Sequence, residues 1–305
     1  MDNCINCIIN ASKKDNYATI DTDSEEEYNK FIEIVNVKKM FFDYFDKKIL
    51  NNINIVVNEG DKILLIGANG VGKSTLLRVL SGFHIPKSYD HFNILGSNSP
   101  NDQFNGLAYL GNKWNRNISF CGITPYTADI KAGEMMKKWQ EDNLQRRNEL
   151  VKILNINLEW KMNKVSDGER KRVQILLALL KPFKLLIIDE FLYELDIVIR
   201  DRFFDYLDKE CKLRNSAIIY ATHIFDNLYK WANNVIYISN GKCDGKININ
   251  KFNINNNLYI SVKEKLANDY KYTLLEKNID PLKYGPQYGY SSGRLSLKKF
   301  DYNNT

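Results

Sequence analysis

Long apolar runs and cysteine are both scarce in this sequence. Every apolar stretch falls well short of the roughly 18 residues that a membrane-spanning helix needs, so no transmembrane segment is expected. The first ten residues have neither a basic region nor a long apolar region, and we therefore expect no secretory signal. The 305 residues include only five cysteines, an odd number. This favours reduced thiols and a cytoplasmic protein, with the nucleus as the alternative compartment.

The net charge is also small, at +6, but it is unevenly spread. Residues 1–30 hold three basic and seven acidic side chains, and this polar stretch predicts a disordered leader. Residues 246–305 hold ten basic and five acidic side chains, an excess too mild to support nucleic-acid binding directly without a recognition motif. Cys4 and Cys7 form an isolated C-x-x-C in the leader. Without a second pair of ligands, a solvated segment is favoured there over a metal or redox site.

Short apolar runs alternate with helical patterns between about residues 31 and 245. Strands are expected at residues 32–37, 53–57, 62–66, 92–95, 107–110, 185–188, 217–220 and 235–238. Such alternation is typical of an α/β domain with an open, largely parallel sheet. Helical spacing across about residues 130–180 interrupts the alternation and predicts an inserted helical subdomain. Residues 246–305 differ in composition and are predicted to form a C-terminal extension with one helix near residues 260–267.

A glycine-rich loop lies between the strand at residues 62–66 and a predicted helix. The loop and the start of the helix comprise Gly67, Ala68, Asn69, Gly70, Val71, Gly72, Lys73, Ser74 and Thr75, all predicted to bind nucleotide. The pattern is G-x-x-x-x-G-K-[ST] in its required strand–loop–helix context, which disfavours an ordinary glycine-rich turn. Glycines let backbone N–H groups wrap a phosphate, and the helix N-terminus adds positive potential. We expect Lys73 to reach the β- and γ-phosphates and Ser74 to ligate Mg²⁺.

Two carboxylates follow the apolar run at residues 185–188. Asp189 stands where P-loop ATPases place the carboxylate of the magnesium shell. Glu190 comes next, and it is predicted to polarise the attacking water as a general base. A pair of solvated acids at a strand end is the alternative, and the phosphate-binding loop upstream makes it the weaker interpretation.

Ser166, Asp167, Gly168 and Glu169 open the next predicted helix. A serine hydroxyl, a flexible glycine and free backbone N–H groups at a helix N-terminus can bind an anion. The same residues also fit an ordinary capping box, in which Ser166 and Glu169 satisfy each other's backbone N–H groups. Taken alone, this segment favours the capping box.

Together, these motifs resemble the ATP-binding-cassette (ABC) ATPases. Residues 67–74, 165–169 and 185–190 and His223 match, in order, the Walker A loop, the LSGGQ signature, Walker B with its catalytic glutamate and the switch histidine. The resemblance covers about residues 32–245. It implies a P-loop NTPase of ABC type, with a mixed sheet flanked by helices, an inserted helical subdomain and a small antiparallel β subdomain. It also implies ATP hydrolysis, with ATP and Mg²⁺ as cofactors.

The resemblance further implies how the site is completed. The predicted catalytic residues are Lys73, Glu190 and His223, and the predicted signature residues are Ser166, Asp167, Gly168 and Glu169. In that family two cassettes form a head-to-tail dimer, so Ser166 and Gly168 would contact the γ-phosphate of ATP held by the partner. His223 would contact the γ-phosphate in its own cassette. Tyr44 matches the position of the family's adenine-stacking aromatic residue, with a core tyrosine in an aromatic cluster as the alternative.

Three departures separate the chain from the family pattern. The signature reads VSDGE, with Glu169 where glutamine is usual. The glutamine-loop position, after the strand at residues 107–110, is Asn112, which we keep as a further candidate ligand of Mg²⁺. Past Walker B, only Leu195 and Asp196 of the family's SALD remain. Loss of the loop glutamine weakens the expectation of coupling to a membrane transporter.

Closer similarity links the chain to the soluble members of ABC subfamily I. It is carried by residues 107–111, 160–168 and 220–226. These proteins have a lone cassette and no membrane domain, and the resemblance implies an ATP-dependent homodimer that regulates a larger assembly of the CCR–NOT type. Two alternatives stay open: the ATP-hydrolysing subunit of a membrane ABC transporter with separate transmembrane partners, and a nucleotide-gated binding module with negligible turnover.

Overall fold

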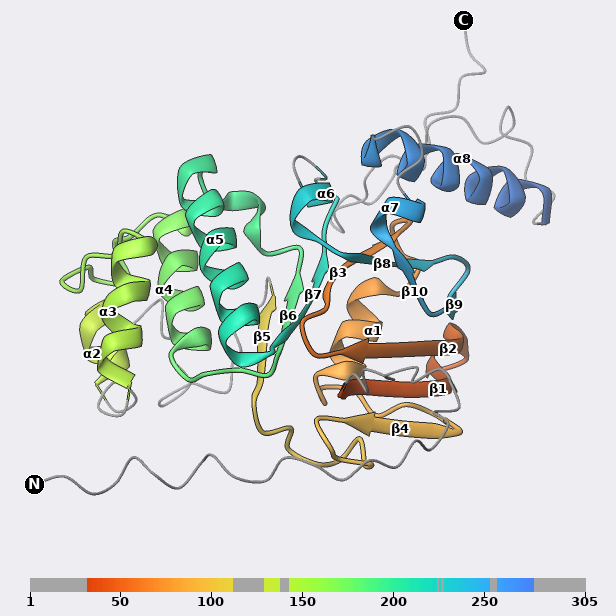
Figure 1. Ribbon diagram of the computed structural model, residues 1–305, viewed down its shortest axis with the longest axis horizontal. Helices are drawn as coiled ribbons and strands as arrows, with labels where there is room; N and C mark the ends of the chain where they lie inside the picture. The colour runs from red at the N-terminus through yellow and green to blue at the C-terminus, as the bar shows by residue number, and fades with distance from the viewer. Residues whose placement is uncertain are drawn as a thin grey trace, which may run out of the picture. The chain divides into compact units, whose positions relative to one another are not determined.

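The computed structural model describes residues 32–111, 129–137, 143–223, 225, 228–252 and 257–276. Its main sheet has six strands in the order β10-β8-β3-β7-β6-β5 (Figure 1). They are β3 (Lys62–Gly67), β5 (Leu107–Gly111), β6 (Leu185–Asp189), β7 (Ala217–Ala221), β8 (Asn234–Ile238) and β10 (Lys246–Asn248). Neighbouring strands are parallel, except that β10 is antiparallel to β8. The predicted mixed sheet of the ABC-type fold is therefore confirmed. The predicted leader lies outside the described residues.

Strand β6 shows why the strands of the main sheet have continuous apolar sequences. Leu185 and Ile187 face one hydrophobic cluster, Leu186 and Ile188 face the other, and all are fully buried. Helices cover both faces of the sheet, so neither face of a central strand needs polar side chains. Such a strand carries its polar residues at its end, and in β6 that residue is Asp189.

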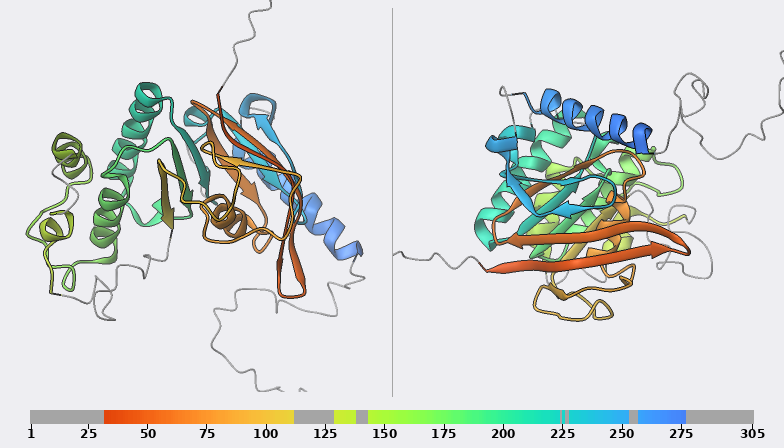
Figure 2. Two further views of the ribbon diagram at one scale, coloured as in Figure 1. Left: turned by 90° about the horizontal axis from the view of Figure 1, so that it is seen from below. Right: turned by 90° about the vertical axis from the view of Figure 1, so that its right-hand side faces the viewer.

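A second, four-stranded sheet has the order β4-β1-β2-β9. It consists of β1 (Glu33–Tyr44), β2 (Lys47–Asn58), β4 (His91–Ile94) and β9 (Cys243–Asp244). β1 pairs antiparallel with both β2 and β4, whereas β9 pairs parallel with β2. Helix α1 (Lys73–Leu80) lies between the two sheets, because Leu76 and Leu77 share one hydrophobic cluster with Leu50 of β2 and Ile187 of β6 (Figure 2).

The inserted helical subdomain lies between β5 and β6 in the chain. Its helices are α2 (Ala132–Met136), α3 (Leu144–Ile153) and α4 (Asp167–Leu179). A buried ion pair joins it to helix α5 (Ile197–Arg214): Arg146 donates to Glu210 at 2.6 Å and to the Leu179 carbonyl, also at 2.6 Å. Helices α3, α4 and α5 thus pack together on the face of the main sheet opposite α1 (Figure 1).

The chain continues with short helices α6 (Leu228–Trp231) and α7 (Ile249–Phe252) and the longer α8 (Leu258–Glu276). The last of these is the helix predicted near residues 260–267, and it is longer at both ends. No helix in the described part of the chain combines the length and the apolar character required to cross a bilayer.

Candidate functional site

The glycine-rich loop joins β3 to α1 as the sequence predicts. Gly67 ends β3, and Lys73 is the first residue of α1. The loop glycines are required for two different reasons. A Cβ at Gly67 would lie 2.5 Å from the Ile238 carbonyl oxygen, so only glycine lets β3 approach β8 here. Gly72 has a φ of 107° and a Cβ there would lie 2.8 Å from Leu50, so both its backbone conformation and its close packing exclude a larger residue.

Lys73 curls back over the loop that precedes it. Its Nζ donates to the carbonyl oxygens of Gly67 at 3.0 Å and Ala68 at 3.1 Å, and the residue is only 5% exposed. Burial lowers the pKa of the Lys73 ammonium, whereas the carboxylates of Glu190 and Asp189 raise it. The Lys73 ammonium is therefore a buried, desolvated positive charge. The loop around it is open to solvent at Asn69 and Gly70. An anion bound in the loop would offset the cost of desolvating that charge.

The hydroxyl of Ser74 donates a 2.9 Å hydrogen bond to Oδ1 of Asp189. The other carboxylate oxygen, Oδ2, accepts a 3.2 Å hydrogen bond from the hydroxyl of Tyr109 on β5. Burial raises the pKa of Asp189, and these two hydrogen bonds lower it. Burial and the Asp189 charge together raise the pKa of Tyr109 to about 12, so the phenol stays protonated and acts as a donor.

Glu190 and His223 lie beside each other at the same edge of the sheet. Nε2 of His223 is 2.8 Å from Oε1 of Glu190, and both side chains are partly exposed. The register explains the contact, because Asp189 pairs with Ala221 across parallel strands β6 and β7, and both functional residues follow these positions. Glu190 has a φ of 49°, an unfavourable value for a residue with a Cβ, and its N–H donates to the Ala221 carbonyl. Backbone strain of this kind is typical of functional sites.

These residues provide a suitable donor set for a nucleotide with Mg²⁺. A serine hydroxyl and a carboxylate, already 2.9 Å apart, are the hard oxygen ligands that Mg²⁺ prefers. The Lys73 ammonium and the N-terminus of α1 supply positive charge for phosphate oxygens. The arrangement can therefore bind a phosphorylated ligand with its metal and present Glu190 to a water molecule.

The signature segment begins helix α4. Ser166 is the N-cap of that helix, and the capping box that the sequence favours is present. The hydroxyl and the N–H of Ser166 each donate to Oε2 of Glu169 at 2.9 Å, and the N–H of Glu169 donates back to Ser166 Oγ at 3.3 Å. The segment is exposed at its start. The side chains of Ser166 and Asp167 thus lie in solvent, while the capping box engages the hydroxyl and the N–H of Ser166.

Two predicted residues are less firmly connected to the site. Tyr44 ends β1, is 45% exposed and packs edge-on to Phe42 and His84, so it is not a core tyrosine. Its contact with adenine stays a prediction. Asn112 lies outside the described residues. The sequence did not indicate Tyr109, although its hydroxyl contacts Asp189. Its one distinguishing feature in the sequence is a polar group near the end of β5, the strand that pairs with β6.

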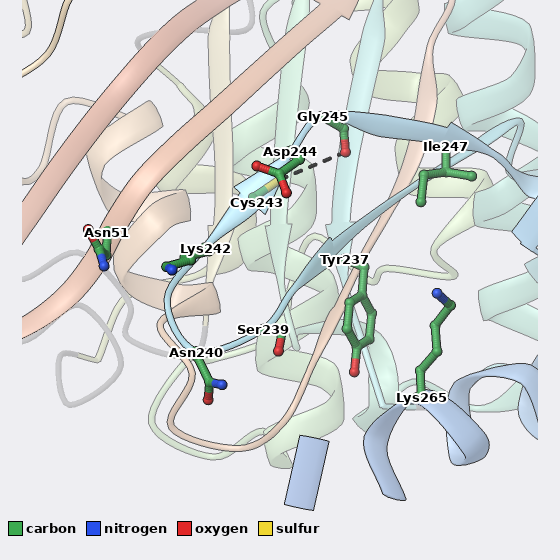
Figure 3. Close-up of a pocket in the computed structure, with 10 residues that line it drawn as sticks. All are labelled: Asn51, Tyr237, Ser239, Asn240, Lys242, Cys243, Asp244, Gly245, Ile247 and Lys265. Atoms are coloured by element: carbon green, nitrogen blue, oxygen red, sulfur yellow. Dashed lines mark hydrogen bonds between the residues drawn. The ribbon is translucent and has the colours of Figure 1, made fainter. Parts of the chain in front are cut away.

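A polar cavity of about 580 Å³ lies elsewhere, and none of the predicted site residues line it. Figure 3 shows its walls coming from Asn51 of β2, from strands β8 to β10 and from Lys265 of α8. The hydroxyl of Tyr237 in its wall donates a 2.5 Å hydrogen bond to Oδ2 of Asp269. This cavity therefore shares no lining residue with the candidate nucleotide site.

Comparison with known proteins agrees with the motifs. The family model described as ABC transporter matches residues 50–192. ABC transporter I family member 20 of Arabidopsis thaliana is 41% identical over 201 residues, which cover 64% of this chain and 61% of that protein. CCR4-associated factor 16 of Saccharomyces cerevisiae is 35% identical over 227 residues, which cover 69% of this chain and 76% of that protein.

Solved structures share the fold. A dimeric ATP-binding cassette in a post-hydrolysis state, bound to ADP and Pi, superposes with a TM-score of 0.58 at 20% identity, covering 70% of this chain and 98% of that one. Similarity to the plant and yeast relatives shows that the chain belongs to the ATP-binding-cassette family of ATPases and, within it, to the ABC transporter I family.

Proposed function

We propose that this ABC ATPase binds ATP with Mg²⁺, hydrolyses it in a head-to-tail homodimer, and uses ATP-driven closure to regulate a larger assembly. The observation that carries the proposal is the convergence of Lys73, the Ser74–Asp189 pair and the Glu190–His223 pair at the carboxyl ends of β3, β6 and β7. In open α/β sheets this edge is where ligands bind.

Each side chain has a defined task in this proposal. Lys73 neutralises charge on the β- and γ-phosphates, and Ser74 and Asp189 would hold Mg²⁺, which supplies charge neutralisation and orients the phosphates. In this proposal Glu190 orients and deprotonates the attacking water, a role that typically contributes about 10²–10⁴ in rate. His223, whose Nε2 is 2.8 Å from Oε1 of Glu190, orients that carboxylate and contacts the γ-phosphate.

The dimer would be two-fold symmetric, with two ATP molecules buried between Walker A of one copy and the signature of the other. Without nucleotide, positively polarised helix N-termini and two Walker lysines would face an empty gap, so closure should need ATP. Moving a dimer from mostly open to mostly closed takes about 5.5 kcal/mol of differential binding. Two γ-phosphates, each held by several charge-assisted hydrogen bonds of about 1.5–3 kcal/mol, can supply that amount.

Sedimentation of Glu190→Gln tests the dimer, since this variant should retain ATP. We expect a dimer with ATP–Mg²⁺, a monomer with ADP, and a monomer with ATP–Mg²⁺ when Ser166→Arg is added. A dimer in all three conditions would mean that the contact lies away from the nucleotide, and Ser166 would then be a helix cap alone.

The regulated assembly is the finer part of the proposal. The yeast relative is named for its association with CCR4, so a CCR–NOT-type complex is the first candidate partner. Affinity purification of Glu190→Gln with ATP bound, followed by identification of the co-purifying proteins, tests this directly. Recovery of the same proteins with Lys73→Ala would show that the association does not depend on nucleotide.

A second candidate function is the ATP-hydrolysing subunit of a membrane transporter. The family model that matches residues 50–192 is described as ABC transporter, and this favours the candidate. Co-purification from detergent-solubilised membranes with a polytopic protein, in constant stoichiometry, would establish it. Recovery of the chain and its partners entirely in the membrane-free fraction would contradict it.

A further inference from the structure

The start of α4 carries a carboxylate at the point where the proposed dimer requires hydrogen-bond donors. Glu169 is the third residue of the helix, and its side chain folds back over the N-cap residue Ser166. In the proposed closed dimer this same helix end meets the γ-phosphate of the partner's ATP. A negative side chain and a negative ligand would therefore compete for one set of donors.

The competition is specific at the level of single atoms. The Ser166 hydroxyl and the Ser166 N–H both donate to Oε2 of Glu169, each at 2.9 Å. A hydroxyl has one proton, so while it is donated to Glu169 it is not available to a phosphate oxygen. The Ser166 hydrogen bonds also lower the pKa of Glu169, which keeps the carboxylate charged at neutral pH.

The charge of Glu169 is less compensated than that of its neighbour. Asp167, in the same turn, forms an ion pair with Arg170 at 2.5 Å. Among the described residues no basic group lies within ion-pair distance of Glu169, and Arg172 acts on it only through its longer-range field. The guanidinium of Arg172 instead donates to the carbonyls of Leu154 and Asn155. Glu169 therefore places at this helix end a carboxylate charge that no ion pair among the described residues offsets.

We infer that Glu169 acts as a brake on ATP-driven dimer closure, holding the Ser166 hydroxyl in the open state and repelling the incoming γ-phosphate. This inference rests on the proposed function and deepens it. Closure then requires the phosphate to displace the carboxylate from Ser166 in both composite sites. Like charges brought together at an interface oppose association strongly, so the brake raises the ATP concentration that dimerisation needs.

The test is sedimentation velocity across an ATP–Mg²⁺ titration, with Glu190→Gln as the reference. Glutamine is equally compatible with the third position of a capping box, so Glu169→Gln removes the charge and retains the cap. We expect the double variant Glu169→Gln/Glu190→Gln to reach half-dimerisation at an ATP concentration lower by about tenfold or more. Glu149→Gln, an exposed carboxylate on α3, makes the same change in net charge and serves as the matched control in the Glu190→Gln background.

Glu169→Ala in the Glu190→Gln background separates a released brake from a new attraction. A glutamine amide could itself donate to the partner's phosphate, whereas alanine cannot. The inference requires both the alanine and the glutamine variants to dimerise at lower ATP. A shift with glutamine alone would overturn it, as would an equal shift with Glu149→Gln.

The remaining outcomes distinguish this inference from the proposed function. If Glu169→Gln/Glu190→Gln and Glu190→Gln dimerise at the same ATP concentration, the brake is wrong and the proposed dimer stands. If Glu169→Gln/Glu190→Gln binds ATP but stays monomeric at a saturating ATP concentration, both the brake and the head-to-tail dimer are wrong. If Glu169→Gln/Glu190→Gln dimerises with ATP–Mg²⁺ and Glu190→Gln alone does not, the result supports both the brake and the head-to-tail dimer.

Discussion

Ser74 donates a hydrogen bond to Asp189 at 2.9 Å, across 115 positions of the sequence. Asp189 ends β6, and Ser74 lies in α1, the helix that follows β3. Strands β3 and β6 are not neighbours in the sheet, because β7 lies between them. The hydrogen bond therefore forms only when β3, β7 and β6 are paired in this order, with their carboxyl ends at the same edge of the sheet. The proposed Mg²⁺ site depends on that assembly rather than on either motif alone.

Replacement of Lys73 by alanine should abolish ATP binding at concentrations that saturate the wild type. The lysine is the only side-chain cation that the loop places among its own carbonyls, and an arriving phosphate would have no ammonium to offset its charge. Equilibrium dialysis with labelled ATP measures the effect. Lys39→Ala, which removes an exposed lysine paired with Asp90 at 2.7 Å, should bind ATP normally. Unchanged affinity in a folded Lys73→Ala protein would contradict the assignment of the loop.

Glu190→Gln should retain ATP and Mg²⁺ binding while turnover falls by about 10²-fold or more. The amide keeps the shape of the side chain and its position 2.8 Å from His223, but it cannot accept the proton of water. Phosphate release under saturating ATP measures turnover, with Glu149→Gln as a control for the charge change. Wild-type turnover in Glu190→Gln would mean that the base lies elsewhere.

Tyr109→Phe should raise the Mg²⁺ concentration needed for half-maximal turnover by about tenfold, with little change in the turnover rate at saturating Mg²⁺. The phenol donates to Oδ2 of Asp189 and so fixes the carboxylate whose other oxygen would ligate Mg²⁺. Tyr89→Phe provides the control, since Tyr89 packs on Phe92 at 5.3 Å between ring centroids. Equal Mg²⁺ requirements in the wild type and Tyr109→Phe would show that Ser74 alone positions the carboxylate.

Glu210→Ala should reduce the free energy of unfolding by about 3–5 kcal/mol, because it leaves the buried Arg146 guanidinium without its carboxylate. Both side chains are less than a tenth exposed, so solvent cannot replace the lost partner. Urea denaturation followed by circular dichroism measures the loss. The double variant Arg146→Met/Glu210→Leu removes both charges and should recover most of the stability. A double variant as unstable as Glu210→Ala would point to packing rather than charge.

Much of the fold followed from local patterns. The strands that end in functional residues are short apolar runs that helices cover on both faces, and such runs are readable without the structure. The loop from Gly67 to Ser74 was equally readable, because its glycines and lysine occupy fixed offsets. The pairing of β9 parallel to β2 was not, since two residues brought in from a distant part of the chain carry no local signal.

The sequence by itself determined the available chemistry: which side chains can bind phosphate and metal, where a candidate general base follows a strand, and that Ser166 and Glu169 form a capping box. These depend on residue type and short spacing. Only the tertiary structure decided which of these groups meet. Glu190 reaches His223, and Tyr109 reaches Asp189, because the register of three parallel strands sets their side chains at one edge. Register depends on packing across the whole sheet, and no single segment encodes it.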